Sequence, residues 1–255
     1  TRDMGIHLLN IKRAVAAIVL VCSMGVAYAA DFVVDGISYK ILSADDKTCA
    51  VTASETGYTG DIVVPATVTN GDNEYAVTTI DNTAFKGNKN ITSVAISSGV
   101  TTLANGTFSG GSALKGLTIP GSVASIPNAM CMNCTSLESI AISEGVKEFI
   151  DYAFYNCALT EIELPKTIAS ISKNVFTKCD IVSVKVLAET PPTIEEKTFE
   201  STAVPNAVLE VPSESVILYQ KANYWKDCGE IKGLEGKGEA PTSIATVKTE
   251  NGVAV

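Results

Sequence analysis

The stretch that decides the fold is residues 137–157, which read LESIAISEGVKEFIDYAFYNC. It opens with an apolar-x-x-apolar-x-apolar strand, continues with two apolar residues three apart, and ends with Phe154 three residues before Cys157. The pattern recurs along the chain at spacings of 23, 23, 23, 22 and 23 residues, with the Phe position held by Phe85, Phe108, Cys131, Phe154, Phe176 and Phe199. A fixed period of this length predicts a solenoid of stacked coils.

The period also indicates how each coil is built. A repeat length of about 20 to 29 residues, together with this strand signature, is typical of leucine-rich repeats. The successive strands of such repeats pair in parallel about 4.8 Å apart. Side chains alternate along each strand, so one set enters a shared core and the other faces solvent. Pro120 and Pro165 end their strands, because proline has no N–H for the ladder. We predict an α/β repeat solenoid, predominantly β and right-handed, with parallel strands on its concave face.

The two ends of the chain have different patterns, which predict caps. Residues 31–61 alternate apolar and polar residues around turn signals and predict a β-hairpin cap. Residues 62–204 form the predicted solenoid, with residues 62–65 as a degenerate first coil and a hairpin turn at Asn70-Gly71. Residues 205–233 predict a C-terminal cap with a last strand at 209–211. Its short helix would contain Val216, Leu218, Tyr219, Ala222 and Trp225. Residues 234–255 predict a linker and an incomplete β unit.

The first thirty residues have the pattern of an export signal. Lys12 and Arg13 precede the apolar run 14–26, and Ala27-Tyr28-Ala29 follows with small residues at the positions that a signal peptidase reads. The run is shorter than the ~20 residues that span a bilayer. A lipid-modified Cys22 is an alternative, although Val21 is bulkier than the small residue expected before such a cysteine. We predict residues 1–30 as a signal peptide, and a secreted or cell-surface protein without a transmembrane segment.

Charge and histidine content argue against several classes of function. The chain has 28 Asp or Glu, 19 Lys or Arg and one His, with a formal charge of −9. Loss of residues 1–30 would remove His7 and a net +2, leaving −11. Without His the chain cannot form Ser-His-Asp or Cys-His sites or an HExxH zinc site. An acidic chain also lacks the clustered Lys and Arg that nucleic acid binding needs.

Six cysteines follow the predicted signal: Cys49, Cys131, Cys134, Cys157, Cys179 and Cys228. An even number in an exported chain is typical of disulfides. However, Cys134, Cys157 and Cys179 occupy the same place in consecutive coils, so their Cβ vectors run parallel and fit disulfide geometry poorly. Cys131-x-x-Cys134 is similar to a zinc or redox pair, but Cys131 holds a Phe position and no second pair completes a site. We predict buried free thiols, no metal site and no cofactor.

The unit L-x-x-I-x-I-P-x-x-V-x-x-I-x-x-x-A-F-x-x-C resembles the repeat of the BspA-like bacterial surface family. The match covers roughly residues 62–202 and is clearest at Leu137, Ile142, Val146, Phe149, Ala153, Phe154 and Cys157. The resemblance implies an extracellular or surface-attached bacterial protein with no catalytic residues, from a family with several members implicated in adhesion to host matrix proteins or other cells. Residues 243–255 are similar to the opening of a C-terminal sorting domain of such proteins but stop early.

A candidate binding surface follows from the strand positions that face solvent. We predict that this surface binds a protein partner, such as a host matrix protein or another cell surface, through Lys115, Glu138, Ala141, Glu161, Glu163 and Lys185. Tyr152 and Tyr155 flank Phe154 on a loop and are a second candidate, as an exposed aromatic patch. The alternative for the strand residues is an ordinary solvated face, since neither large aromatic groups nor Arg occur there. The alternative for the tyrosines is that Phe149 and Phe154 belong to the core and the tyrosines pack against neighbouring loops.

Other functions stay open at this stage. A polysaccharide-binding accessory protein would use the tyrosines rather than the glutamates. A structural spacer for a further C-terminal module would use neither surface. Glu161 and Glu163 would lie about 7 Å apart on one strand, within the range of a glycosidase carboxylate pair, but a shallow solenoid provides no cleft. We therefore predict that the chain is not an enzyme.

Overall fold

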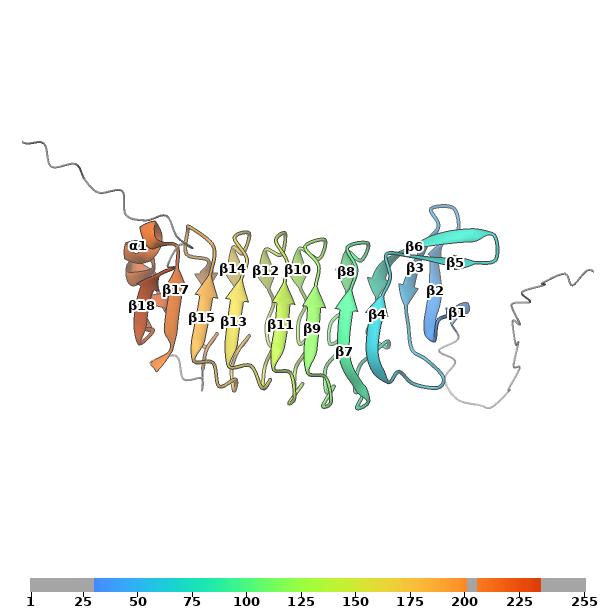
Figure 1. The fold of residues 1–255 in the computed structure, drawn as a ribbon, viewed down its shortest axis with the longest axis horizontal. Coiled ribbons are helices and arrows are strands. Elements are labelled where there is room, and N and C mark those ends of the chain that lie inside the picture. Colours follow the sequence, from blue (N-terminus) through green and yellow to red (C-terminus); the bar gives the residue numbers. More distant parts are fainter. Residues whose placement is uncertain (1–29, 201–205, 235–255) are drawn as a thin grey trace, which may run out of the picture.

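The computed structural model describes residues 30–200 and 206–234, which form an elongated stack of coils (Figure 1). The predicted leucine-rich repeat solenoid, mostly β and built from stacked parallel strands, is confirmed. The predicted signal peptide and the predicted tail lie outside the described residues, apart from residue 30 and residue 234.

The N-terminal sheet joins antiparallel hairpins to the first parallel pairing of the solenoid. Across the sheet, its strands are β1 (Phe32–Val34), β2 (Ile37–Ser43), β3 (Thr48–Val51), β6 (Asn73–Ile80) and β5 (Thr67–Asn70). β5 and β6 form the predicted hairpin, with Asn70 opposite Asn73, whereas β6 runs parallel to β3 and to β8 (Thr102–Leu103). The Tyr58 hydroxyl, which donates to the Thr52 carbonyl (2.6 Å) and accepts from the Ser38 N–H (3.1 Å), ties the following loop to this sheet.

Eight parallel strands form one wall of the solenoid, and we call their outward side the strand face. They belong to two sheets of four: β4 (Gly60–Val64), β7 (Ile91–Ile96), β9 (Gly116–Ile119) and β11 (Ser139–Ile142), then β13 (Glu161–Leu164), β15 (Ser183–Val186), β17 (Val208–Val211) and β18 (Glu230–Gly233). The prediction that residues 209–211 form the last strand is wrong, because β18 pairs in parallel with β17. A four-residue strand with Ile231 as its one bulky apolar residue carries too little pattern to be recognised.

A second row of short strands forms another wall, which the sequence reasoning missed. These strands pair in parallel and are β10 (Ser125–Ile126), β12 (Glu148–Phe149), β14 (Ser170–Ile171) and β16 (Thr193–Ile194). Each contains the second residue of an apolar pair, such as Ile126 or Phe149, and points it into the core. Two-residue strands are below the length at which alternation can be read.

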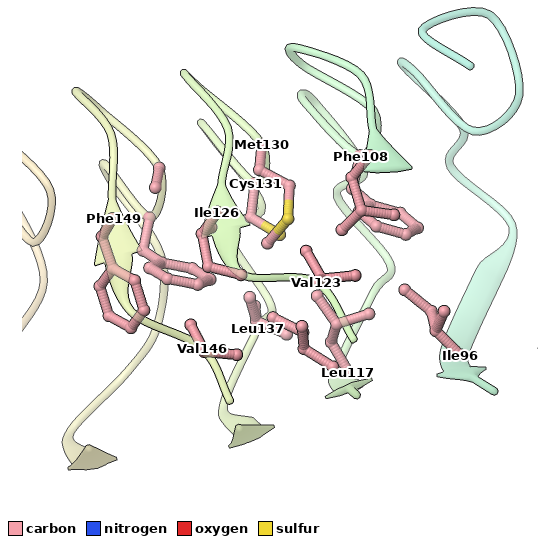
Figure 2. Packing of buried hydrophobic residues seen from close by; sticks show 14 of the residues in the cluster. Ile96, Phe108, Leu117, Val123, Ile126, Met130, Cys131, Leu137, Val146 and Phe149 are labelled. Atoms are coloured by element: carbon pink, nitrogen blue, oxygen red, sulfur yellow. The ribbon is translucent and has the colours of Figure 1, made fainter. Parts of the chain in front are cut away.

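The core is a continuous aliphatic column with a row of aromatic rings. Phe85 stacks on Phe108 with ring centroids 5.4 Å apart, and Phe154 stacks on Phe176 at 5.8 Å. Cys131 holds the Phe position of the coil between those of Phe108 and Phe154. It lies beside Met130 (Figure 2) and is fully buried as predicted. Where two successive coils both have Phe, the Phe position supplies a ring contact between them.

In three consecutive coils, the cysteine three residues after the Phe position donates a hydrogen bond to the preceding coil. The thiols of Cys134, Cys157 and Cys179 donate to the carbonyls of Phe108, Cys131 and Phe154, respectively, each over 3.1 Å. All three are buried and free. The burial of all three thiols confirms that they occupy the same place in consecutive coils, as the sequence predicts. Burial also raises the pKa of the Cys179 thiol from 9.0 to about 11.

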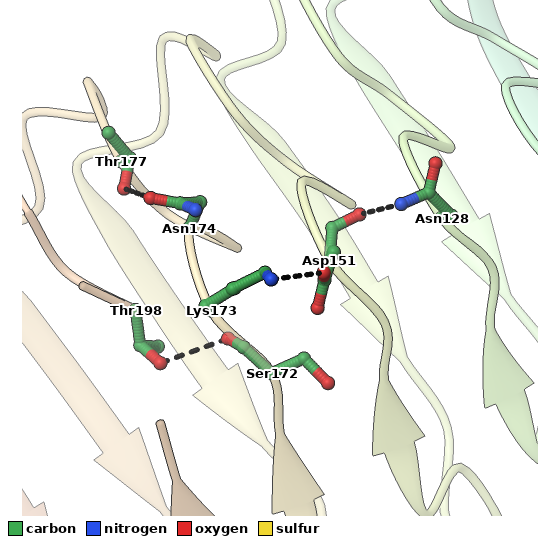
Figure 3. A network of polar contacts seen from close by, with 7 residues as sticks. All are labelled: Asn128, Asp151, Ser172, Lys173, Asn174, Thr177 and Thr198. Atoms are coloured by element: carbon green, nitrogen blue, oxygen red, sulfur yellow. Dashed lines mark hydrogen bonds and ion pairs between the residues drawn. The ribbon is translucent and has the colours of Figure 1, made fainter. Parts of the chain in front are cut away.

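Polar groups also connect successive coils along the turns (Figure 3). The Asn128 side-chain amide donates to the Asp151 carbonyl over 3.0 Å, and the Asp151 carboxylate forms an ion pair with Lys173 at 3.6 Å. The Thr198 hydroxyl donates to the Ser172 carbonyl over 2.9 Å. Side chains therefore add hydrogen bonds and an ion pair to the backbone contacts between coils, such as that from the Ala129 N–H to the Asp151 carbonyl at 3.0 Å.

The C-terminal cap is helical but shorter than predicted. It consists of η2 (Ser213–Ser215), α1 (Val216–Lys221) and η3 (Trp225–Asp227). Tyr219 and Trp225 are buried, and they donate to the carbonyls of Ala188 (2.7 Å) and Pro192 (2.8 Å). Leu218 lies in α1 as predicted, although it is 52% exposed. The prediction is wrong for Ala222 and Trp225, because α1 ends at Lys221 and Trp225 begins η3.

The Phe row gives a first prediction about stability. Phe154 is fully buried between Phe149 and Phe176, so Phe154→Ala should lower the free energy of unfolding by about 3–5 kcal/mol through cavity formation. Urea unfolding followed by circular dichroism measures the change. Val182→Ala, at a side chain that is 50% exposed, is the control and should change the free energy by less than about 0.5 kcal/mol. Equal effects of the two variants would contradict the core assignment.

Two glycines give a second prediction. A Cβ on Gly121 would overlap the carbonyl of Glu144 in the next coil, whereas a Cβ on Gly106 meets only Ser109, at 3.7 Å. Gly106 has a φ of +68°, and Ala129, a coil later, has a φ of +52°, so a side chain is tolerated there. We expect Gly121→Ala to destabilise the protein by about 1–3 kcal/mol and Gly106→Asn to have little effect, measured by the same urea titration. A neutral Gly121→Ala would show that the coils are not in contact at this turn.

The raised thiol pKa gives a third prediction. The folded state holds the Cys179 proton more tightly than the unfolded state, so this contribution to stability is complete below pH 9.0 and is lost as the pH rises toward about 11. The free energy of unfolding should therefore fall between these pH values. Cys179→Ala removes the titrating group and should show a smaller fall over the same range. Parallel pH profiles for the two proteins would rule out this thiol as a source of the pH dependence.

Candidate functional site

The predicted binding residues of the strands lie together on the strand face. Lys115 and Glu138 directly precede β9 and β11, Ala141 lies in β11, Glu161 and Glu163 lie in β13, and Lys185 lies in β15. All are exposed except Lys185, which is half-buried. Parallel pairing with one register from coil to coil explains why residues about 22 apart in sequence are neighbours here.

One half of this face carries a row of alternating charges. Strand pairing places Glu163, Lys185, Glu210 and Lys232 side by side on successive strands. Lys185 binds Glu163 at 2.9 Å and Lys232 binds Glu210 at 3.0 Å. Sequence reasoning missed Lys232 because it did not predict β18. It missed Glu210 although it predicted the strand at 209–211, because it assigned that strand to the cap and not to the binding surface. Each such exposed pair contributes little to stability, about 0–1 kcal/mol.

The other half of the face is small and mostly uncharged. Its outward residues include Ser93, Ala95, Gly116, Thr118, Ser139 and Ala141. At its N-terminal end, the Asp61 carboxylate accepts hydrogen bonds from the hydroxyls of Ser93 (2.6 Å) and Thr92 (2.7 Å), which lower its pKa. The strand face therefore has two chemically different halves.

The boundary between these halves is also a break in the sheet. β11 and β13 are neighbours in the stack but do not pair, so the ladder of the strand face stops at β11 and starts again at β13 (Figure 1). On the other wall, β12 and β14 remain paired across the same two coils. The break is therefore confined to the strand face.

The break coincides with a change in coil length. The first apolar residue of the strand segment comes three positions after the cysteine position in the earlier coils, as from Cys134 to Leu137. It comes only two positions after it from Cys157 to Leu159 and from Cys179 to Ile181. In the longer turn, the Leu137 N–H donates to the Cys134 carbonyl over 2.9 Å. β7, β9 and β11 thus follow the longer turn, and β13 and β15 follow the shorter one. The 22-residue spacing in the sequence was the signal for this break.

A shallow groove of about 330 Å³ lies over the break, and we call it the break groove. Its floor includes Ile140 and Ile162, and its lining is Glu138, Ser139, Ile140, Glu161, Ile162, Glu163, Ser183, Lys185 and Glu210. Ile140 and Ile142 are only half-buried, whereas Leu117 and Ile119 at the same places in the preceding coil are buried. Strand pairing would cover these two isoleucines, and its absence leaves them accessible.

The structure does not bring Tyr152 and Tyr155 into this surface. They lie on the turn after β12, half-buried, with ring centroids 5.7 Å apart. The Lys178 ammonium lies 5.2 Å from the centre of the Tyr155 ring. The tyrosines thus form a separate, smaller surface with one cation beside it.

The described residues contain neither a metal-binding cluster nor a membrane-spanning helix. No group of three His, Cys, Asp or Glu side chains is arranged to hold a metal ion among residues 30–200 and 206–234. Within the same residues, no helix has both the length and the apolar character needed to cross a bilayer.

Comparison with solved structures shows the same fold in bacterial proteins. The leucine-rich repeat protein of T. pallidum is 19% identical, with a TM-score of 0.55 over 69% of this chain and 82% of that one. A leucine-rich repeat protein of Bacteroides ovatus ATCC 8483 is 22% identical, with a TM-score of 0.53 over 71% of this chain. The match spans 61% of the length of the Bacteroides protein.

Sequence comparison identifies the repeats themselves. No curated protein matches the chain. The BspA type leucine rich repeat region matches in six copies, over residues 67–183 and 147–232, which together exceed half of the chain. Those residues contain the Phe row, the cysteine positions and all of the strand face except β4 and the last residue of β18. The chain therefore belongs to the BspA-type leucine-rich repeat family.

Proposed function

We propose that the chain is a secreted or surface-displayed, non-enzymatic module that binds a protein partner through its strand face, as in adhesion to a matrix protein or another cell. Leucine-rich repeat domains generally mediate protein interactions, and proteins of the BspA type are typically found at the cell surface. The repeat is a non-enzymatic scaffold. The proposal extends these family properties to this chain.

The observation that carries the proposal is the strand face itself. Eight short strands present their outward side chains on one side of a rigid stack, and Lys115, Glu138, Glu161 and Glu163 are exposed there. Rigid backbone positions reduce the entropy that binding would otherwise cost. A surface of this kind recognises a partner by shape and charge, without any chemical step.

A second candidate function is polysaccharide binding, which the turn after β12 favours. Tyr152 and Tyr155 offer two ring faces and Lys178 a cation beside them. Aromatic side chains combine an apolar face with a polar hydroxyl, which suits a sugar surface. Both tyrosines are partly buried, so this surface is smaller than the strand face.

The experiment for both functions is a binding screen of residues 31–234 against immobilised extracellular matrix proteins and a panel of polysaccharides. We expect saturable binding to a protein, weakened by salt because the exposed charges are screened. The double variant Glu161→Lys/Glu163→Lys should abolish it, and Tyr152→Ala/Tyr155→Ala should not.

The opposite pattern would favour the second candidate. Binding to polysaccharides alone, lost in Tyr152→Ala/Tyr155→Ala and kept in the charge-reversal variant, would move the site to the tyrosines. Silence against every protein and polysaccharide would contradict both functions. The chain would then serve as a spacer between other modules.

A further inference from the structure

We propose that the break groove is the recognition site for an extended, positively charged protein segment in which basic and apolar residues alternate. This inference deepens the proposed function and rests on it, because it names the place on the strand face and the chemistry of the partner. Three independent features of the groove support it: its backbone, its floor and its charge.

The backbone feature is the interruption of the ladder. Within the strand face, β11 and β13 are the two inner strands that lack a pairing partner on one side, namely toward each other. The two strands lie too close together for a further strand to enter between them. Their facing edges nevertheless carry backbone N–H and C=O groups without ladder partners, and an extended segment lying along the outer side of the groove can bond these groups. The remaining inner strands are already paired on both sides.

The floor feature is the accessible Ile140. Ile140 lines the groove and is half-buried, while Ile162, at the same place in the next coil, is 3% exposed. Covering Ile140 removes apolar surface from water, at roughly 25 cal/mol per Å². A partner therefore needs apolar side chains directed into the groove.

The charge feature is an excess of carboxylates at the rim. Glu163 is paired with Lys185, and Glu210 with Lys232. Glu138 and Glu161 have neither an ion pair nor a side-chain hydrogen bond within residues 30–200 and 206–234, and both are exposed. Two unneutralised carboxylates beside an apolar floor attract a partner with positive side chains and repel one with negative side chains.

These features together describe the partner. In an extended chain successive side chains point to opposite sides, and residues two apart are separated by roughly 7 Å. Apolar residues on one side would enter the groove. Lysines on the other side have stems long enough to reach back to the rim carboxylates while the ammonium remains in water.

The test uses a fluorescein-labelled octapeptide of alternating Lys and Val and the chain as it exists, with binding followed by fluorescence anisotropy at low salt. Glu138→Gln/Glu161→Gln keeps the shape of the rim and removes two charges. We expect it to weaken binding roughly tenfold, the sum of two exposed ion pairs at up to ~1 kcal/mol each. The matched control is Glu195→Gln/Glu196→Gln, at exposed residues after β16, and should change affinity less than about twofold.

A second variant separates the groove from charge alone. Inserting one serine between Ala158 and Leu159 restores the three-residue spacing of the earlier coils without changing any charge. If the ladder then closes over Ile140, peptide binding should be lost although Glu138 and Glu161 remain. Circular dichroism and a urea titration show whether each variant is folded before its affinity is read.

The outcomes are distinct. No binding of the Lys-Val peptide, equal weakening in the rim and control variants, or full affinity in a folded insertion variant would each overturn the inference. An octapeptide of alternating Glu and Val should not bind. If a matrix protein binds the strand face but ignores Glu138→Gln/Glu161→Gln, the proposed function stands and the groove is not its site.

Discussion

Everything in this molecule depends on contact between one coil and the next. A single coil of about 22 residues cannot bury its own apolar side, so the Phe row and the aliphatic column exist only because coils stack. Stacked rings such as Phe154 on Phe176, with nearly parallel planes 7° apart, repeat one packing solution along the chain. The same stacking aligns the turns, so that Asn128, Asp151 and Lys173 form one polar path.

The need for coil-to-coil contact also explains where the structure tolerates change. Gly121 lies where two turns touch and admits no Cβ, whereas the position of Gly106 is held by Ala129 and Tyr152 in later coils. Outward strand positions carry no such restriction, and their residues vary from Gly116 to Glu161. Surface chemistry can therefore change along the strand face while the core keeps one pattern.

A one-residue change in turn length coincides with a change in the surface. The shorter link from Cys157 to Leu159 leaves the buried column intact, since Leu159 and Ile162 remain buried. The ladder of the strand face is interrupted at the same coil, and Ile140 beside the interruption is half-buried.

The sequence by itself determined the solenoid, its period, the core positions and the burial of Cys134, Cys157 and Cys179, because every coil repeats the same apolar pattern. It also placed Glu138, Glu161 and Glu163 on one face and the tyrosines on a loop, since alternation along a strand is local. Only the tertiary structure decided that β11 and β13 do not pair and that β18 extends the charged row to Lys232. Pairing between coils is a long-range contact, and no window of one repeat contains the residues that decide it.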